Sequence, residues 1–217
     1  MAEPGEQLVR YARLVAESPV NLVSRAARGE VESRHVPEAR AVVAALGVAD
    51  GERWLDLGTG GGLPGMVLAI LRPDVDVVLV DATSRKTREV ERFRDELGLA
   101  NVAVRWGRAE ALAREEGLRG AFDGVVARAL APLTPLAELA RGFVGPGGRI
   151  VAVKGPAWRD EESAMRSAAA RLRVHVVGAQ RVAGAPTETW LVELRADGDP
   201  PEWVPRREGQ PQRSPLA

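Results

Sequence analysis

The chain has 217 residues, of which 45% are apolar and 28% are charged, and it contains no cysteine. This length suits one domain with a real hydrophobic core, while the missing cysteine excludes disulfides, thiolate metal sites and cysteine nucleophiles. Thirty basic residues balance thirty acidic ones, so the net charge gives no general reason to bind nucleic acid, and such binding requires a local patch.

The N-terminal residues are charged and lack the apolar segment of a signal peptide, and no apolar run is long enough to cross a bilayer. The sequence therefore predicts a cytoplasmic protein without a membrane partner. The two histidines, His35 and His175, are too few and too far apart to indicate a metal site.

Residues 1–50 predict an N-terminal helical cap. Two apolar stripes have helical spacing; one comprises Leu8, Tyr11, Leu14 and Val15, and the other comprises Val42, Val43 and Leu46.

Residues 51–196 predict an α/β domain, because short Val-rich runs alternate there with helical patterns. Seven strands are expected, at Arg53–Leu57, Asp76–Val80, Val102–Arg105, Asp123–Ala127, Arg149–Val153, Val174–Val177 and Trp190–Leu194. The connection GAQRVAGAPTET before the last strand contains Gly and Pro and has no helical period, so the last two strands are expected to form an antiparallel hairpin. A doubly wound sheet that ends in this way is typical of S-adenosylmethionine-dependent methyltransferases.

Residues 197–217 form a tail that is rich in Pro, Gly and Arg. This composition cannot form a packed element alone. The tail is expected to be either a disordered end or an arm that becomes ordered on a partner.

The segment WLDLGTGGGLPG, from Trp54 to Gly65, can be read in two registers. From Gly60, its glycines match the G-x-G-x-x-G of a dinucleotide site, with Asp81 about twenty residues further on. From Asp56, the same letters read D-x-G-x-G-x-G, the loop of S-adenosylmethionine methyltransferases. A carboxylate at Asp56 suits a ligand with ammonium and sulfonium charge and opposes a pyrophosphate, whereas Asp81 is expected to bind ribose hydroxyls in either register.

Residues that follow the other strands are candidates for ligand contacts, since ligands bind at the carboxyl ends of such sheets. Glu110, in GRAE after the third strand, is expected either to accept from an adenine amino group or to stabilise a helix N-terminus. Arg128 and Lys154 follow the fourth and fifth strands and are expected to make this edge positive, which favours a phosphate-bearing substrate. Arg128 has the alternative of pairing with a carboxylate, and His35 is expected to be structural.

The acceptor of a methyl group can be narrowed by chemistry. Methylation of C5 of a pyrimidine requires a cysteine, and methylation of an exocyclic amine uses an Asn/Asp-Pro-Pro-aromatic turn where this chain has ARALAP. N7 of guanine attacks the methyl group directly, so positioning and charge stabilisation suffice without a general base. The alternatives are a ribose 2′-hydroxyl with Lys154 as base and, less favoured, a nicotinamide-dependent oxidoreductase that uses the Gly60 register.

Eight segments resemble, in order, the bacterial glucose-inhibited division protein B family. They are NLVS at Asn21, RHVPEA at Arg34, LDLGTGGGLPG, LVDATSRK, GRAE, FDGVVARA, VAVKGP and PRREGQPQRSPL. The resemblance covers nearly the whole chain, and LPG and FDGVVARA are its most specific parts. It implies a guanine-N7 methyltransferase that uses S-adenosylmethionine and acts as a monomer on 16S ribosomal RNA, either free or in the small ribosomal subunit.

Carried over residue by residue, the resemblance also implies roles for individual side chains. Cofactor contacts are expected at Gly58, Leu63, Ala109, Glu110 and Arg128, beside Asp56, Gly60 and Asp81 of the loop pattern. RNA contacts are expected at Asn21, Arg108 and Lys154, with Arg128 and Lys154 as the catalytic residues. The chain departs from the family's His-x-x-Asp-Ser, because His35 is followed by Glu38 and Ala39. A ribosome assembly factor that binds the same cofactor without catalysis is a further alternative.

Overall fold

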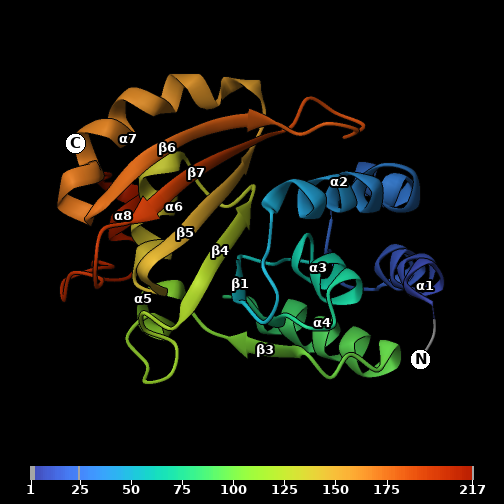
Figure 1. The fold of residues 1–217 in the computed structure, drawn as a ribbon. Helices are drawn as coiled ribbons and strands as arrows, with labels where there is room; N and C mark the ends of the chain where they lie inside the picture. The colour runs from blue at the N-terminus through green and yellow to red at the C-terminus, as the bar shows by residue number, and fades with distance from the viewer. Residues whose placement is uncertain (1–2, 24, 217) are drawn as a thin grey trace.

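The Val-rich runs form one seven-stranded sheet in a computed structural model that describes residues 3–23 and 25–216 (Figure 1). Ser24, in the NLVS segment, lies outside the described residues, as do residues 1, 2 and 217. The strands are β1 (Arg53–Leu57), β2 (Asp76–Asp81), β3 (Val102–Trp106), β4 (Phe122–Arg128), β5 (Val144–Lys154), β6 (Val174–Arg181) and β7 (Trp190–Ala196).

The strand order is β3-β2-β1-β4-β5-β7-β6, and the first five strands in this order are parallel to one another. Strand β7 runs antiparallel to both β5 and β6, so the predicted methyltransferase-type sheet and its antiparallel hairpin are confirmed. Chain progression reverses direction between β1 and β4. The carboxyl ends of these two central strands therefore diverge into a crevice, where ligands bind in open α/β sheets.

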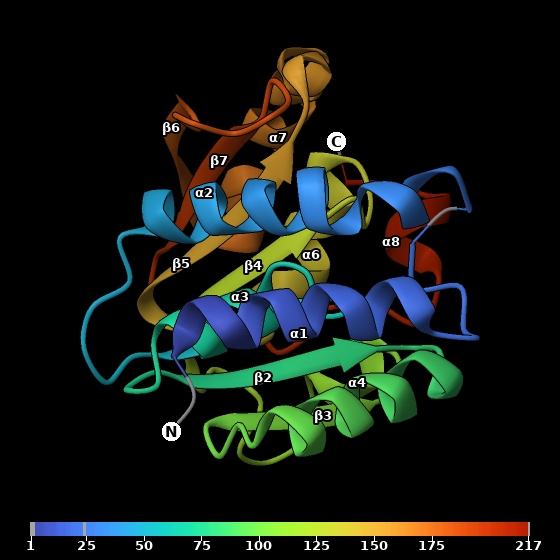
Figure 2. The same ribbon diagram turned by 90° about the vertical axis from the view of Figure 1, so that its right-hand side faces the viewer.

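Helices cover both faces of the sheet. One face carries α1 (Pro4–Glu17), α2 (Val36–Leu46), α3 (Gly65–Leu71) and α4 (Ser84–Leu97), and Figure 2 shows α1 and α2 lying across it. The other face carries α5 (Ala109–Leu112), α6 (Leu133–Arg141) and α7 (Arg159–Leu172). Short helical turns η1 (Arg25–Glu30) and η2 (Val31–His35) precede α2, η3 (Pro156–Trp158) precedes α7, and α8 (Gln210–Arg213) lies in the tail. None of the helices in the described part of the chain has the length and apolar character needed to span a bilayer.

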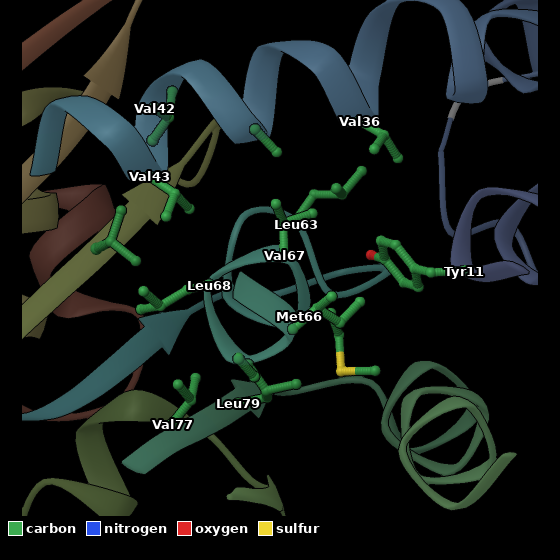
Figure 3. Packing of buried hydrophobic residues seen from close by; sticks show 14 of the residues in the cluster. Tyr11, Val36, Val42, Val43, Leu63, Met66, Val67, Leu68, Val77 and Leu79 are labelled. Carbon is green, nitrogen blue, oxygen red and sulfur yellow. The ribbon is translucent and has the colours of Figure 1, made fainter. Parts of the chain in front are cut away.

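The N-terminal cap shares its core with the sheet. Tyr11 of α1 is wholly buried and points toward Met66 and Val67 of α3 (Figure 3). Its ring meets that of Phe93 of α4 edge-on, with centroids 6.3 Å apart, and its hydroxyl donates to the Gly61 carbonyl over 2.8 Å. Burial of a large aromatic side chain in this position stabilises the cap and the loop after β1 together.

The tail packs against its own chain, so the expectation of a disordered end or a partner-ordered arm is wrong. Val204 is fully buried, and the Arg206 guanidinium pairs with the buried Glu138 carboxylate of α6 over 2.7 Å. Arg119 donates to the carbonyls of Pro201 and Val204 over 2.7 and 2.8 Å. Composition could not reveal this docking, because the partners that order the tail lie in other parts of the sequence.

Candidate active site

The crevice between β1 and β4 opens into a cavity of about 580 Å³. Five parts of the chain line it: the cap, the loop after β1, the start of α4, the ends of β4 and β5, and the loop between β6 and β7. The lining residues include Leu22, His35, Glu38, Gly58, Gly60, Leu63, Lys86, Arg128, Lys154, Thr187 and Thr189. A second cavity of about 650 Å³ lies beside α2 and the end of α3, near the amino ends of the strands. The first cavity is the better candidate because it lies at the carboxyl ends of the strands.

The loop after β1 requires glycine for its conformation and for its close packing. Gly58, Gly60 and Gly62 have φ of +74°, +57° and +98°, values that favour glycine. A Cβ atom on Gly58 would lie 2.7 Å from Leu130, and one on Gly62 would lie 2.4 Å from Met66. Gly60 has more room, since a Cβ atom there would lie 3.6 Å from its nearest neighbour. The loop thus presents its backbone to the cavity at Gly60.

Asp56 lies beneath this loop and is 1% exposed. Its Oδ2 accepts from the Thr59 hydroxyl over 2.7 Å and from the Gly65 amide over 2.9 Å, which ties the loop to the start of α3. Its Oδ1 has no hydrogen-bond partner among the described residues. Burial raises the pKa of Asp56 to about 6, although the two hydrogen bonds act in the opposite direction.

Asp81, at the end of β2, faces the same loop. Its Oδ2 accepts from the Gly60 amide over 3.0 Å, and its Oδ1 accepts from the Thr83 amide over 2.8 Å. These bonds fix the carboxylate at the strand end, beside the segment that passes from β2 into α4.

Glu110 of α5 is buried and contacts the tail. Its Oε1 accepts from the Gly209 amide over 2.9 Å and from the Arg108 guanidinium over 3.0 Å. Although burial acts to raise the pKa of Glu110, these hydrogen bonds and the Arg108 charge lower it below its usual value. Its Oε2 is buried and lacks a partner within residues 3–23 and 25–216. Such an atom is available to accept from a ligand, next to the backbone of Ala109.

Arg128, at the end of β4, pairs with Glu38 of the cap over 3.1 Å. The other oxygen of Glu38 accepts from the hydroxyls of Thr187 and Thr189 over 2.7 and 2.8 Å. Burial raises the pKa of Glu38, but these hydrogen bonds and the Arg128 charge outweigh burial and lower it. Sequence reasoning singled out Glu38 only as a departure from a family pattern and missed both threonines, which lie about 150 residues away.

Lys154 is also paired. Its ammonium donates to Glu161 of α7 over 2.7 Å and to the Ala131 carbonyl over 2.8 Å. Arg128 and Lys154 therefore each have a carboxylate partner, so the expectation that they make this edge positive is wrong, whereas the alternative that Arg128 pairs with a carboxylate is confirmed. Together they hold the cap and α7 against the ends of β4 and β5.

The remaining predicted residues lie in two places, in or beside the cavity and near the tail. His35 lines it, and burial, followed by the charge of Arg128, lowers the pKa of His35. Asn21 is exposed beside the lining residue Leu22 and accepts from Arg28 over 3.1 Å. Arg108 is partly exposed and also approaches Glu208 of the tail within 3.5 Å. The structure thus brings His35 and Arg128 to one cavity, leaves Asn21 exposed beside it, and places Arg108 and Glu110 together near the tail.

The donor and acceptor groups at these strand ends suit S-adenosylmethionine. The open backbone at Gly60 admits an amino-acid group, and Asp81 offers a carboxylate at the position where a ribose is expected. The unpartnered Oε2 of Glu110 provides an acceptor for an adenine amino group.

Comparison with known proteins gives consistent matches. Residues 5–186 match the family described as rRNA small subunit methyltransferase G. A protein of that name from Deinococcus radiodurans is 37% identical over 95% of this chain and 85% of its own length. Another, from Symbiobacterium thermophilum, is 34% identical over 99% of this chain and 92% of its own length.

Solved structures show the same fold. A mutant of MtNAS in complex with S-adenosylmethionine superposes with a TM-score of 0.60 at 20% identity, over 88% of this chain and 72% of that one. A SAM-dependent methyltransferase from Aquifex aeolicus has a TM-score of 0.55 at 16% identity, over 87% of this chain and 97% of that one.

Proposed function

Because the chain belongs to the rRNA small subunit methyltransferase G family, and is thus an S-adenosylmethionine-dependent methyltransferase of 16S ribosomal RNA, we propose that its acceptor atom is N7 of a guanine. The hydrogen bonds of Lys154 support this proposal, because its ammonium donates to the Glu161 carboxylate and to the Ala131 carbonyl. A lysine held in this way is poorly suited to remove a proton from a ribose hydroxyl. N7 carries no proton that must be removed.

The cofactor is assigned to the loop after β1 and to the ends of β2 and β3. The backbone at Gly58, Gly60 and Leu63 borders the methionine part, while Asp56 supports the loop from below. Asp81 accepts from the ribose hydroxyls, and Ala109 with Glu110 contacts the adenine. Arg128 lines the same cavity.

The reaction needs positioning and a balanced charge. S-adenosylmethionine supplies an electrophilic methyl group on a positively charged sulfonium. Methylation at N7 leaves a positive charge on the purine, so one positive charge is present in the site before and after transfer. The paired side chains Arg128–Glu38 and Lys154–Glu161 add almost no net charge to this environment. Such an arrangement opposes neither the charge of the sulfonium before transfer nor the charge of the methylated purine after it.

The RNA is expected to contact Asn21, Arg108 and Lys154. We propose that the enzyme acts as a monomer. We propose 16S RNA, either free or within the small ribosomal subunit, as the substrate. An enzyme with this substrate acts in the cytoplasm.

The proposal is tested by identifying the methylated nucleoside. The purified chain is incubated with S-adenosylmethionine labelled in the methyl group and, separately, with small subunits and with free 16S RNA from a strain that lacks the gene. Digestion to nucleosides should release the label as N7-methylguanosine, and primer extension after reduction and aniline cleavage should locate one guanine. Label in a 2′-O-methylated nucleoside would refute the choice of acceptor, and no incorporation with either substrate would favour a non-catalytic assembly factor.

A further inference from the structure

Trp106 is the most exposed large apolar side chain of the described residues, with 67% of its surface accessible. It is the last residue of β3, which is the edge strand of the sheet, and its register partner is Asp81 at the end of β2. The indole therefore lies at the same edge of the sheet as the candidate active site. A tryptophan that is exposed at a functional edge is a candidate for binding a flat partner.

The indole is fixed in place although it is exposed. Its Nε1 donates to the Ala82 carbonyl over 3.1 Å, and the backbone beside it is held because the Gly107 amide donates to the Asp81 carbonyl over 3.1 Å. A ring that is already ordered loses little conformational entropy when a ligand stacks on it. Trp106 thus offers an open aromatic face at low entropic cost.

Three basic residues lie at the start of α4, the helix that follows the residue that holds this ring. Arg85, Lys86 and Arg88 follow Ala82, the residue that holds the indole, and no acidic residue lies between them. The Cα atoms of Arg85 and Lys86 are within about 11 and 14 Å of that of Ala82, by the reach of the chain. Arg85 and Arg88 are exposed, and none of the three has an ion pair with a described residue. Their charge is therefore available to an anionic partner.

Lys86 connects this surface to the cavity, since it also lines the cavity wall. An extended ligand can therefore contact Trp106 and reach the candidate active site at the same time. We refer to these residues together as the α4–β3 surface, which comprises Arg85, Lys86, Arg88 and Trp106.

An aromatic face bordered by cations matches the chemistry of single-stranded nucleic acid. Bases stack on exposed aromatic rings, and Lys and Arg bind the phosphates between them. The adenine of the cofactor is a weaker match, because its assigned partner Glu110 is buried whereas Trp106 is open to solvent.

We propose that the α4–β3 surface binds a single-stranded segment of the substrate RNA that flanks the target guanine, with one base stacked on Trp106. This inference rests on the proposed function, since it takes RNA as the substrate. It assigns recognition of the flanking strand to residues for which the sequence motifs indicated no role.

The test measures RNA binding and cofactor binding separately, so that it does not depend on turnover. An RNA oligonucleotide that spans the mapped guanine is titrated with the full-length protein by fluorescence anisotropy, and S-adenosylhomocysteine is titrated by calorimetry. Trp106→Ala should weaken RNA binding about 5- to 100-fold and leave the affinity for S-adenosylhomocysteine unchanged. Trp106→Phe should restore most of the loss. The control is Trp203→Ala, which removes another exposed indole from the tail and should leave both affinities unchanged.

The cations are tested by salt dependence. The double variant Arg85→Ala/Arg88→Ala should lower the slope of log affinity against log salt concentration by about 1.4, which is two contacts at the value for single strands. Unchanged RNA affinity in Trp106→Ala would overturn the proposal. Equal losses of RNA and S-adenosylhomocysteine affinity would overturn it as well, because the ring would then contact the cofactor. A different methylated nucleoside would instead contradict the proposed function alone.

Discussion

At the scale of single residues, Asp56 links the glycine loop to the helix that follows it. One oxygen of the carboxylate holds both Thr59 and Gly65. Gly65 is required beneath it, because a Cβ atom there would lie 2.3 Å from Leu79 and 2.7 Å from Asp56. Burial disfavours the charged form of this carboxylate and raises the pKa of Asp56 to about 6.

This raised pKa predicts a pH dependence of stability. The pKa of Asp56 is about 6 in the folded chain and 3.8 in the unfolded chain. The contribution of Asp56 protonation to the free energy of unfolding is therefore fully present below pH 3.8 and is lost as the pH rises through 6. Asp56→Asn removes this dependence. Between about pH 4 and about pH 7, the unsubstituted chain should lose about 2–3 kcal/mol of unfolding free energy relative to the variant. Urea unfolding at several pH values measures this shift, and parallel curves would contradict it.

The sequence predicted which site residues lie at the ends of strands. It did not identify the side chains with which they form hydrogen bonds and ion pairs. The positions of Asp81, Glu110 and Arg128 follow from the alternation of strands and helices. The pairing of Arg128 with Glu38 depends on how a cap 90 residues earlier in the sequence packs. Strand periodicity contains no information about that packing, so the sequence allowed a carboxylate partner for Arg128 without identifying it, and indicated none for Lys154.

At the scale of elements, a buried ion pair holds the tail against α6. Glu138 is 0% exposed and accepts three hydrogen bonds from Arg206, from the backbone amide, Nε and Nη2 over 3.0, 2.8 and 2.7 Å. The same tail reaches Glu110 through Gly209. Docking of the tail thus fixes an acid that is assigned to the adenine.

Loss of this attachment should be costly. Arg206→Ala leaves the buried Glu138 carboxylate without its partner and should lower the free energy of unfolding by about 3–5 kcal/mol. The matched control is the exposed neighbour, Arg207→Ala, which should change it by less than about 0.5 kcal/mol. Adding Glu138→Gln to Arg206→Ala should recover part of the loss in urea unfolding. Equal stability of the two single variants would show that the tail is not held by this pair.

At the scale of the whole molecule, the cap and the sheet depend on one another. The buried cluster on one face runs from Leu8 and Tyr11 of α1 through α3 to Val126 and Val151 of the central strands. Strand alternation in the sequence was sufficient to predict the sheet type of a methyltransferase. It could not show that the cap and the sheet share a core, since that requires the spatial position of α1.

A shared core predicts cooperative unfolding. Far-ultraviolet circular dichroism, which is dominated by the helices, and near-ultraviolet dichroism, which reports the packed aromatic rings, should give the same transition. Tyr11→Ala should shift both equally and cost about 3–5 kcal/mol. Val9→Ala, at an exposed position of the same helix, should shift neither. An earlier transition seen by the far-ultraviolet signal alone would show that the cap unfolds separately.

The network around Glu38 has a consequence for the order in which the cavity is completed during synthesis. Synthesis runs from the N-terminus, so Glu38 emerges long before Thr187 and Thr189, its partners 149 and 151 residues later. Glu110 likewise precedes Gly209 by 99 residues. A growing chain already has the glycine loop and Arg128 but lacks one wall of the cavity until translation is nearly complete. The cavity therefore takes its final shape only when the last parts of the chain have left the ribosome.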